Sequence, residues 1–356
     1  MSQMKYTDIK KLIQWYDQNK RSMPWRDTGN PYDVWLSEIM LQQTRIEAVK
    51  PKYIAFKNEL PDIASLANCN DDRLMRLWEG LGYYSRARNL KKCAMYLMEH
   101  YDGTLPKDFE LLKKLPGIGP YTAGAIASIA YNLPAPAIDG NVLRVLTRYY
   151  GITEDIRLPK VKEIIEDKLN DFYSSRHLDS SYSSFNQGIM ELGETVCVPN
   201  GAPQCKKCPL SRNCFAYQNK MTDSIPYRSS LKERKIVERT LFVIRDDQSF
   251  LIHKRPHKGL LAGLYEFPGL DAHLTKSEMI SHVESLGFTP LKITTLPDAK
   301  HIFTHLEWHM RAYEIKVAEI QHTLDDHYYL VNKKELQSLA IPSAFRKYTD
   351  WYSLRD

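Results

Sequence analysis

The stretch Leu115–Tyr121, Leu-Pro-Gly-Ile-Gly-Pro-Tyr, decides the fold class of this chain more clearly than any other. Its two glycines lie directly before a run of small residues with helical character. Glycines let the backbone approach a ligand closely, and the free N–H groups at the start of a helix suit a phosphate. The stretch therefore predicts a helical hairpin that holds an anion through Gly117 and Gly119, although a purely structural turn has the same pattern.

Two acidic residues are candidates for chemistry beside this hairpin. Asp139 follows it after a proline-containing turn, and Glu38 lies in Trp35–Thr44, Trp-Leu-Ser-Glu-Ile-Met-Leu-Gln-Gln-Thr. On a helix, Glu38 is one turn from Val34, so it lies on or beside an apolar face, where burial raises the pKa of a carboxyl. Cleavage of a glycosidic bond needs one carboxyl raised in this way and one ionised carboxylate. Glu38 and Asp139 fit that pair, although a lone Glu on a helix more often packs its stem and reaches water.

Four cysteines, Cys197, Cys205, Cys208 and Cys214, follow a predicted helix within one short segment. Four thiolates at such spacing predict one metal centre. Only one Cys-x-x-Cys pair is present, whereas a zinc ribbon has two, so zinc and an iron–sulfur cluster both remain open from the spacing alone. The other two cysteines of the chain stand apart and are expected to be small buried residues.

Length and composition indicate a multidomain globular protein. The chain has 356 residues, 26% of them charged and 43% hydrophobic, which predicts two or three domains. A net charge of +6 permits a polyanionic partner without requiring one. The sequence contains neither an apolar run of ~20 residues nor the apolar segment of a signal peptide, so a reducing, cytoplasmic location is expected.

The periodicity of the sequence changes along the chain. Residues 1–219 predict helices, residues 220–236 a polar linker, and residues 237–356 a separate α+β domain. The strands expected in this last domain are 239–244, 250–253 and 310–317, and its helix is 277–286. The helices expected in the first part are 6–18, 34–49, 63–67, 72–77, 87–100, 109–115, 122–131, 142–150, 160–173 and 182–196.

The hairpin with its aspartate, the four-cysteine loop and the Trp35–Thr44 segment together resemble the MutY adenine DNA glycosylases, from about Trp15 to Trp351. These belong to the helix–hairpin–helix superfamily that also contains endonuclease III. The resemblance implies a hairpin-bearing subdomain over about 24–137, an iron–sulfur subdomain from 1–23 and 138–219, and a 4Fe–4S cluster on the four cysteines. Seven residues separate Cys197 from Cys205, whereas six are common in the family.

The resemblance also implies roles in catalysis. Glu38 is expected to protonate adenine N7, Asp139 to stabilise the sugar cation or add to it, and Asn141 to orient Asp139. Bifunctional relatives have a lysine where this chain has Tyr121, and a phenol cannot form a Schiff base. The chain therefore resembles the monofunctional members, which remove the base without cutting the strand.

Contacts to damaged DNA follow from the same resemblance. The expected partner is double-stranded DNA that contains adenine opposite 8-oxoguanine or guanine, bound by a monomer associated with the nucleoid. Because a stacked base is out of reach, the adenine must be flipped out of the duplex. The residues expected at the DNA are Trp25 and Arg26 at the adenine pocket, Leu41, Gln43 and Thr44 in the wedge, Gly117 and Gly119 at a phosphate, and Tyr83, Phe303, Thr304 and His305 at 8-oxoguanine.

The C-terminal domain resembles the MutT-like domain of the same family. A Nudix hydrolase needs a glutamate-rich set that holds Mg²⁺. Counted from Gly269, only Glu284 matches this set, because Thr275, Val283, Gly287 and Phe288 occupy the other positions. The domain is therefore expected to recognise 8-oxoguanine without hydrolysing a pyrophosphate. The alternatives for the whole chain are a bifunctional glycosylase/lyase and a non-catalytic lesion-binding protein.

Overall fold

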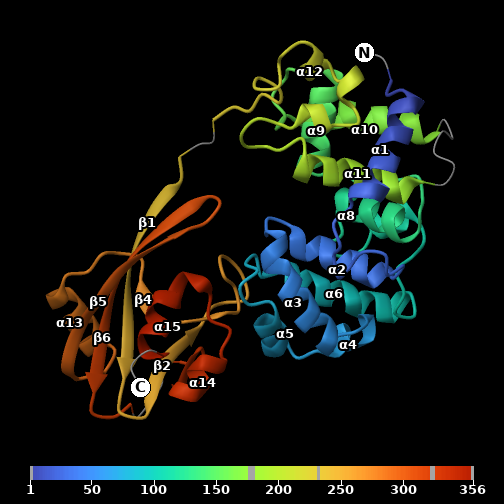
Figure 1. Ribbon diagram of the computed structural model, residues 1–356. Helices are drawn as coiled ribbons and strands as arrows, with labels where there is room; N and C mark the ends of the chain where they lie inside the picture. The colour runs from blue at the N-terminus through green and yellow to red at the C-terminus, as the bar shows by residue number, and fades with distance from the viewer. Residues whose placement is uncertain (1–2, 175–180, 231–232, 321–324, 354–356) are drawn as a thin grey trace. The chain divides into compact units, whose positions relative to one another are not determined.

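Helices form the first part of the chain and a mixed sheet forms the second, in the computed structural model (Figure 1). The structure describes residues 3–174, 181–230, 233–320 and 325–353. The predicted fold class, a helical region followed by an α+β domain, is confirmed. By their contacts, the residues divide into one unit of Met1–Asn68 with Asn89–Ser230 and a second of Cys69–Arg88 with Leu231–Asp356. The domain limits expected from the sequence stay a prediction, and residues 231–232 of the expected linker lie outside the described part.

The helical region contains short helices joined by tight turns. Its elements are α1 (Tyr6–Asn19), α2 (Pro31–Leu41), α3 (Ile46–Glu59), α4 (Ile63–Asn68), α5 (Asp71–Leu77), α6 (Ser85–His100), α7 (Phe109–Lys113), α8 (Pro120–Ala125), the π-helical η1 (Ile126–Ala130), α9 (Gly140–Tyr150), α10 (Pro159–Ser174), α11 (Tyr182–Thr195), η2 (Cys205–Lys207), η3 (Ser211–Asn213) and α12 (Phe215–Gln218). None of the described helices is long and apolar enough to cross a membrane.

One predicted helix, 34–49, is wrong. α2 ends at Leu41, and α3 begins only at Ile46. Between them Gln43 has a φ of +56°, a left-handed conformation that residues with a side chain adopt rarely. The chain therefore turns at 42–45, which no Gly or Pro announces in the sequence.

Apolar residues of four helices form a core at the cysteine-bearing end of the helical region. Among its fully buried side chains are Leu12 of α1, Leu146 of α9, Ile165 of α10 and Leu192 of α11. Cys197, Cys208 and Cys214 pack against the same core while remaining partly exposed. The cysteine loop is therefore attached to a rigid helical support. The two isolated cysteines, Cys69 and Cys93, are buried, as predicted.

A glycine contact fixes the path of the chain from the hairpin to Asp139. A Cβ atom at Gly124 of α8 would lie 2.0 Å from the carbonyl oxygen of Pro136. No side chain fits there, because the neighbouring atom belongs to the backbone. The helix after the hairpin thus packs directly against the segment that leads to Asp139.

The second part of the chain contains a sheet covered by helices on both faces (Figure 1). The strand order is β3-β2-β1-β6-β5; β4 pairs with β1, and β7 pairs with β2. The elements are β1 (Lys235–Arg245), β2 (Ser249–Lys254), β3 (Tyr265–Glu266), β4 (Gly269–Leu270), α13 (Lys276–Ser285), β5 (Pro290–Ile302), β6 (Leu306–Val317), β7 (Tyr328–Asn332), α14 (Lys333–Ser338), η4 (Ser343–Phe345) and α15 (Arg346–Ser353).

Alternate residues of β1 serve the two faces of this sheet. Leu241 and Val243 belong to the core that includes buried residues of α14 and α15, whereas Phe242 and Ile244 belong to the core of α13. The three predicted strands and the predicted helix are confirmed within a few residues. β3, β4, β5 and β7 were missed, because the first two are only two residues long and β5 is mostly exposed, with little apolar alternation.

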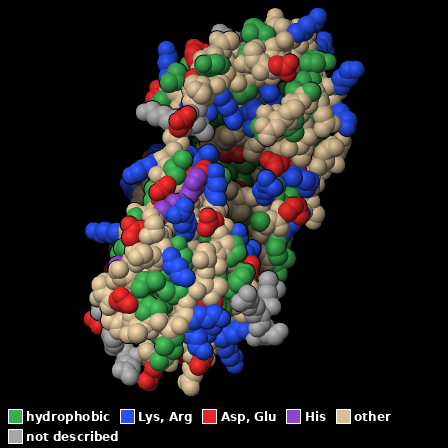
Figure 2. All heavy atoms as spheres, turned by 90° about the vertical axis from the view of Figure 1, so that its left-hand side faces the viewer, with side chains coloured by type: hydrophobic (Ala, Val, Ile, Leu, Met, Phe, Trp, Pro, Cys, Tyr) green, Lys and Arg blue, Asp and Glu red, His purple; other side chains and the backbone are tan. Residues whose placement is uncertain are grey.

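Surface charge on one face of the molecule is mixed rather than gathered in one large patch (Figure 2). On the face drawn in Figure 2, Lys and Arg side chains lie among acidic and neutral ones, and some of them border a hollow in its upper half. This distribution agrees with a net charge of only +6. The overall charge therefore does not indicate a nucleic-acid partner by itself, and a particular site has to do so.

Replacement of Gly124 by Ala tests the close contact with Pro136. We expect the variant to lose about 2 kcal/mol of unfolding free energy, because the new methyl group displaces the backbone opposite it. Urea unfolding followed by far-UV circular dichroism measures this loss. Gly140→Ala is the control, since a Cβ there meets nothing within 4 Å. Equal unfolding midpoints for the two variants would contradict the expectation.

Candidate active site

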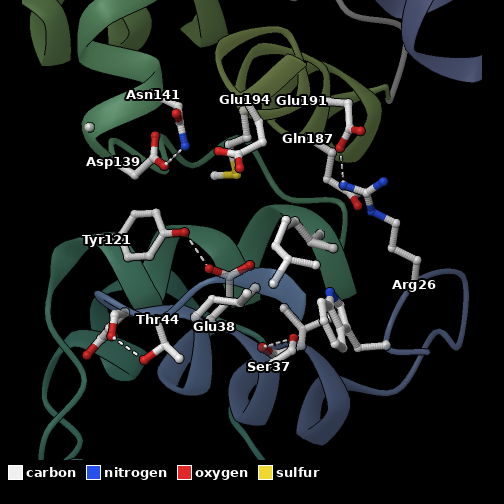
Figure 3. Close-up of a pocket in the computed structure, with 18 of the residues that line it drawn as sticks. Arg26, Ser37, Glu38, Thr44, Tyr121, Asp139, Asn141, Gln187, Glu191 and Glu194 are labelled. Atoms are coloured by element: carbon white, nitrogen blue, oxygen red, sulfur yellow. Dashed lines mark hydrogen bonds and ion pairs between the residues drawn. The ribbon is translucent and has the colours of Figure 1, made fainter. Parts of the chain in front are cut away.

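A pocket of about 500 Å³ opens among α2, the turn after it, α8, the start of α9 and α11. The structure brings nine of the residues expected at the active site into its lining: Trp25, Arg26, Glu38, Leu41, Gln43, Thr44, Tyr121, Asp139 and Asn141. In Figure 3, Glu38 and Asp139 lie on opposite sides of this pocket, with Tyr121 at one end and Arg26 at the other. Residues from distant parts of the sequence thus face one space.

Helix α11 supplies a wall that the sequence reasoning missed. Gln187, Met190, Glu191 and Glu194 all line the pocket. Their spacing of three, four and seven residues places them on one face of a helix. A polar stripe on an otherwise apolar helix was therefore the available signal, but a solvated face gives the same pattern.

Glu38 is a buried carboxyl whose pKa lies near neutrality. Its residue is only 9% exposed, and burial raises its pKa from 4.5 to about 7. The Tyr121 hydroxyl donates a hydrogen bond to Glu38 Oε2 and opposes this rise, as does the charge of Arg26. The negative charge of Asp139 adds to the rise. Glu38 is therefore close to half protonated near neutrality, the state from which a carboxyl acts as a general acid.

Asp139 has a different environment and is half-buried. It caps the N-terminus of α9, where Oδ1 accepts a hydrogen bond of 2.7 Å from the Val142 N–H. Its Oδ2 accepts one of 2.8 Å from Asn141 Nδ2. Burial raises the pKa of Asp139, while these donors and the Arg144 charge oppose the rise. Three groups thus favour the ionised form of Asp139, so the two carboxyls are suited to different roles.

Arg144 connects Asn141 with the start of the cysteine loop. Its Nη2 donates hydrogen bonds of 2.7 Å to Asn141 Oδ1 and to the Gly193 carbonyl, and its Nε donates one of 2.7 Å to the Cys197 carbonyl. Close packing makes this possible, because a Cβ at Gly193 would lie 2.6 Å from Asn141 Cβ. The orientation of Asn141, and through it Asp139, depends on how α11 ends.

Tyr121 occupies the position where a lysine is expected in glycosylases that also cut the strand. It is the second residue of α8, and its hydroxyl points at Glu38 (Figure 3). Burial raises the pKa of this phenol well above its usual value, and the nearby carboxyls raise it further. The described residues that line the pocket include arginines but no lysine. No primary amine of the pocket lining is therefore available for a Schiff base.

The hairpin glycines lie outside the lining of this pocket. Gly117 has a φ of +75°, and a Cβ there would lie 2.7 Å from Asn89 Cβ, so both backbone conformation and space favour glycine. Gly119 caps α8 and has nothing within 4 Å of a built Cβ. The backbone around Gly119 is accordingly open to an approaching ligand.

The four cysteines line one small pocket together with Arg148. The Arg148 Nη1 donates to Cys197 Sγ at 3.2 Å. Burial raises the pKa of Cys208 to about 12, so a cation is needed to hold its thiolate form. Within the described ranges, no three or more His, Cys, Asp or Glu side chains are arranged so that they could hold a metal ion as they lie. The donor set, four thiols around an apolar pocket, nevertheless fits a thiolate-ligated cluster.

Tyr83 and Thr304 meet within the second unit, although they are far apart in the sequence. The Tyr83 hydroxyl and Thr304 Oγ1 are 2.6 Å apart. Tyr83 has a φ of +46° and is 46% exposed, an unusual conformation for an aromatic residue. Beside Thr304, Phe303 packs edge-on against Trp308 with ring centroids 4.8 Å apart, and His305 is exposed.

Known proteins share both parts of the chain. Residues 36–171 match the family described as HhH-GPD superfamily base excision DNA repair protein, and residues 240–351 match the NUDIX domain. An adenine DNA glycosylase of Buchnera aphidicola subsp. Baizongia pistaciae is 33% identical, over 83% of this chain and 82% of its own. That of Buchnera aphidicola subsp. Acyrthosiphon pisum is 31% identical, over 96% and 97%. The structure of a thermostable thymine-DNA glycosylase is 25% identical with a TM-score of 0.53, over 59% of this chain and 95% of its own.

The raised pKa of Glu38 has a consequence for stability. Below pH 4.5 the carboxyl is protonated in both the folded and the unfolded chain; between 4.5 and about 7 only the unfolded chain loses the proton, so stability falls as pH rises. Glu38→Gln should therefore raise the unfolding free energy by on the order of 3 kcal/mol above pH 7, and by nothing near pH 4.

Urea unfolding of both proteins across this pH range measures the difference. Glu47→Gln on the exposed surface of α3 is the matched control, and it should follow the parent at every pH. A Glu38→Gln variant that gains no stability at alkaline pH would show that burial does not raise the pKa of Glu38.

Proposed function

The chain belongs to the adenine DNA glycosylases, and we propose that it is a monofunctional enzyme that releases adenine paired with 8-oxoguanine or guanine in double-stranded DNA. One observation carries the proposal: a buried Glu38 with a pKa near neutrality faces a hydrogen-bonded Asp139 across a single pocket. A glycosidic bond to adenine breaks when the leaving base is protonated and the sugar cation is stabilised.

The two carboxyls have different tasks in the reaction: one donates a proton, and the other stabilises positive charge. Glu38 donates a proton to N7 of the flipped adenine, and the N9–C1′ bond breaks with its electron pair going to the base. The Asp139 carboxylate stabilises the positive charge that develops at C1′. Water then adds at C1′, and its proton returns to the Glu38 carboxylate, which restores the acid. The hydrogen bond from Asn141 keeps Asp139 directed at the pocket.

Tyr121 supports a reaction that stops at base loss. Strand cleavage by a bifunctional glycosylase requires an amine that attacks the sugar. Tyr121 offers a phenol that is hydrogen-bonded to Glu38 and has a pKa far above neutrality. It serves to hold the Glu38 carboxyl in place.

Recognition of the duplex uses groups around the pocket and in the second unit. Leu41, Gln43 and Thr44 at the pocket rim fill the gap that the flipped adenine leaves, and the strained turn at Gln43 presents them. Trp25 and Arg26 contact the base, and Gly117 and Gly119 meet a phosphate. Tyr83, Phe303, Thr304 and His305 form the surface that distinguishes 8-oxoguanine, and the Tyr83–Thr304 contact supports this grouping.

The sheet domain acts as a reader of the lesion. The positions where a Nudix hydrolase has its metal-binding set here serve the fold: Thr275 caps α13, Val283 and Phe288 are buried, and Gly287 has a φ of +87°. A magnesium-dependent hydrolysis therefore lacks all of its expected carboxylates except Glu284.

The four cysteines hold a 4Fe–4S cluster in this proposal. Cys197, Cys205, Cys208 and Cys214 would be its ligands, and the cluster would supply covalent cross-links to the loop between α11 and α12. Such thiolates require a reducing compartment. Through the Cys197 carbonyl and Arg144, the loop also supports the environment of Asp139.

Single-turnover cleavage of a labelled duplex with adenine opposite 8-oxoguanine tests the function. We expect alkali-dependent strand breaks, slower release opposite guanine, and no release opposite thymine. Glu38→Gln should lower the rate at least ~100-fold, because it removes the proton donor, whereas Glu47→Gln should not change it. Breaks that precede the alkali step would contradict the monofunctional assignment.

Iron content tests the cluster separately from activity. Freshly purified protein should contain close to four iron atoms per chain and absorb visible light, as expected for the proposed 4Fe–4S cluster. Cys208→Ser should lose most of this iron, because a ligand is replaced by a hydroxyl. Cys69→Ala, at a buried cysteine outside the loop, should retain it. Stoichiometric zinc without iron would overturn the assignment.

A further inference from the structure

Two arginines lie at the pocket although its proposed chemistry needs a protonated acid. Arg21 and Arg26 both line the pocket that contains Glu38. A cation close to a carboxyl favours its ionised form and so reduces the fraction that can donate a proton. These guanidinium groups must therefore be held by another partner if Glu38 is to remain protonated.

Glu191 of α11 binds both arginines. Its side chain is almost fully buried, with Oε1 2.5 Å from Arg21 Nε and Oε2 2.5 Å from Arg26 Nη2. The Arg26 Nη1 also donates to the Arg21 carbonyl at 2.7 Å. Figure 3 shows the Arg26 guanidinium directed at Glu191. The guanidinium is therefore fixed at two points of the pocket wall.

The charges in the pocket show what this fixation achieves. Burial alone would raise the pKa of Glu191, but hydrogen bonds from Arg21 and Arg26 hold it below its usual value, so Glu191 is a carboxylate at neutral pH. Glu38 retains a raised pKa although Arg26 still lowers it slightly. The ionisable groups of the pocket from every wall are Arg21, Arg26, Arg45, Tyr121, Asp139, Glu191 and Glu194.

We propose that Glu191 is a positioning residue, which ties Arg26 to the wall of the pocket and thereby keeps the Glu38 carboxyl free of a cationic partner. The inference rests on the proposed function, since it concerns the acid of that reaction. Without Glu191, the long side chain of Arg26 loses its carboxylate partner and is free to turn to another carboxyl of the same pocket, Glu38. Glu191 then acts on the reaction only through Arg26.

The pH profile of single-turnover adenine release tests this. Activity requires protonated Glu38, so the rate falls on the alkaline side of its profile. In Glu191→Gln, which keeps the shape and one hydrogen-bond acceptor, the alkaline midpoint should move down by about one pH unit. The rate should fall roughly tenfold on the alkaline side, with little change on the acid side.

Two further variants isolate the part played by Arg26. Arg26→Gln and the double variant Arg26→Gln/Glu191→Gln should share one midpoint, at or above that of the parent, because Arg26 is absent from both and cannot be released toward Glu38. They also keep the test valid if Glu191→Gln fails to fold, since neither leaves an unpaired Arg26. Glu194→Gln, the same charge change on the same helix, should leave the midpoint in place.

The outcomes separate the two proposals. If Glu191→Gln lowers the rate equally at every pH, Glu191 is only structural and the inference is wrong. If Glu191→Gln shifts the midpoint even in the Arg26→Gln background, Glu191 acts directly and the inference is wrong as well. If the parent protein releases no adenine at any pH, the proposed function itself fails.

Discussion

The burial of Glu38 opposite Asp139 is the constraint on which the active site depends. Two carboxyls in one pocket repel each other when both are ionised, so the fold must give them different environments. Asp139 accepts hydrogen bonds from groups at the start of α9. Glu38 accepts one from the Tyr121 phenol and lies among buried residues of α2. Burial of Glu38 makes the folded state less stable at neutral pH, and the proposed function uses the resulting acid.

This arrangement requires helices to approach without side chains between them. At Gly124, α8 touches the backbone before Asp139, and at Gly193, α11 touches Asn141. Both glycines lie beside the segment that carries the carboxylate, so small changes there would move Asp139. Arg144 then joins Asn141 to the cysteine loop through buried hydrogen bonds, which makes the loop part of the support of the site.

The sheet domain has a Nudix-like fold, and the proposed function gives it a role other than hydrolysis. Both faces of the sheet are covered by helices, and the positions of the lost metal set now cap a helix or fill the core. The surface around Tyr83 and Thr304 is polar and aromatic, suited to stacking and hydrogen bonding with a base rather than to holding a cation.

The sequence by itself determined the helical and α+β parts, most helix limits and the residue at 121, because apolar periodicity and residue chemistry are local. It left open whether Glu38 is buried, which the structure shows. The turn at Gln43 was wrongly predicted as helix, since no local signal marks it. Only the tertiary structure decided that α11 forms a wall of the pocket and that Glu191 binds Arg21 and Arg26. Those contacts join residues about 165 positions apart, and their energy depends on burial and charge, which no local pattern contains.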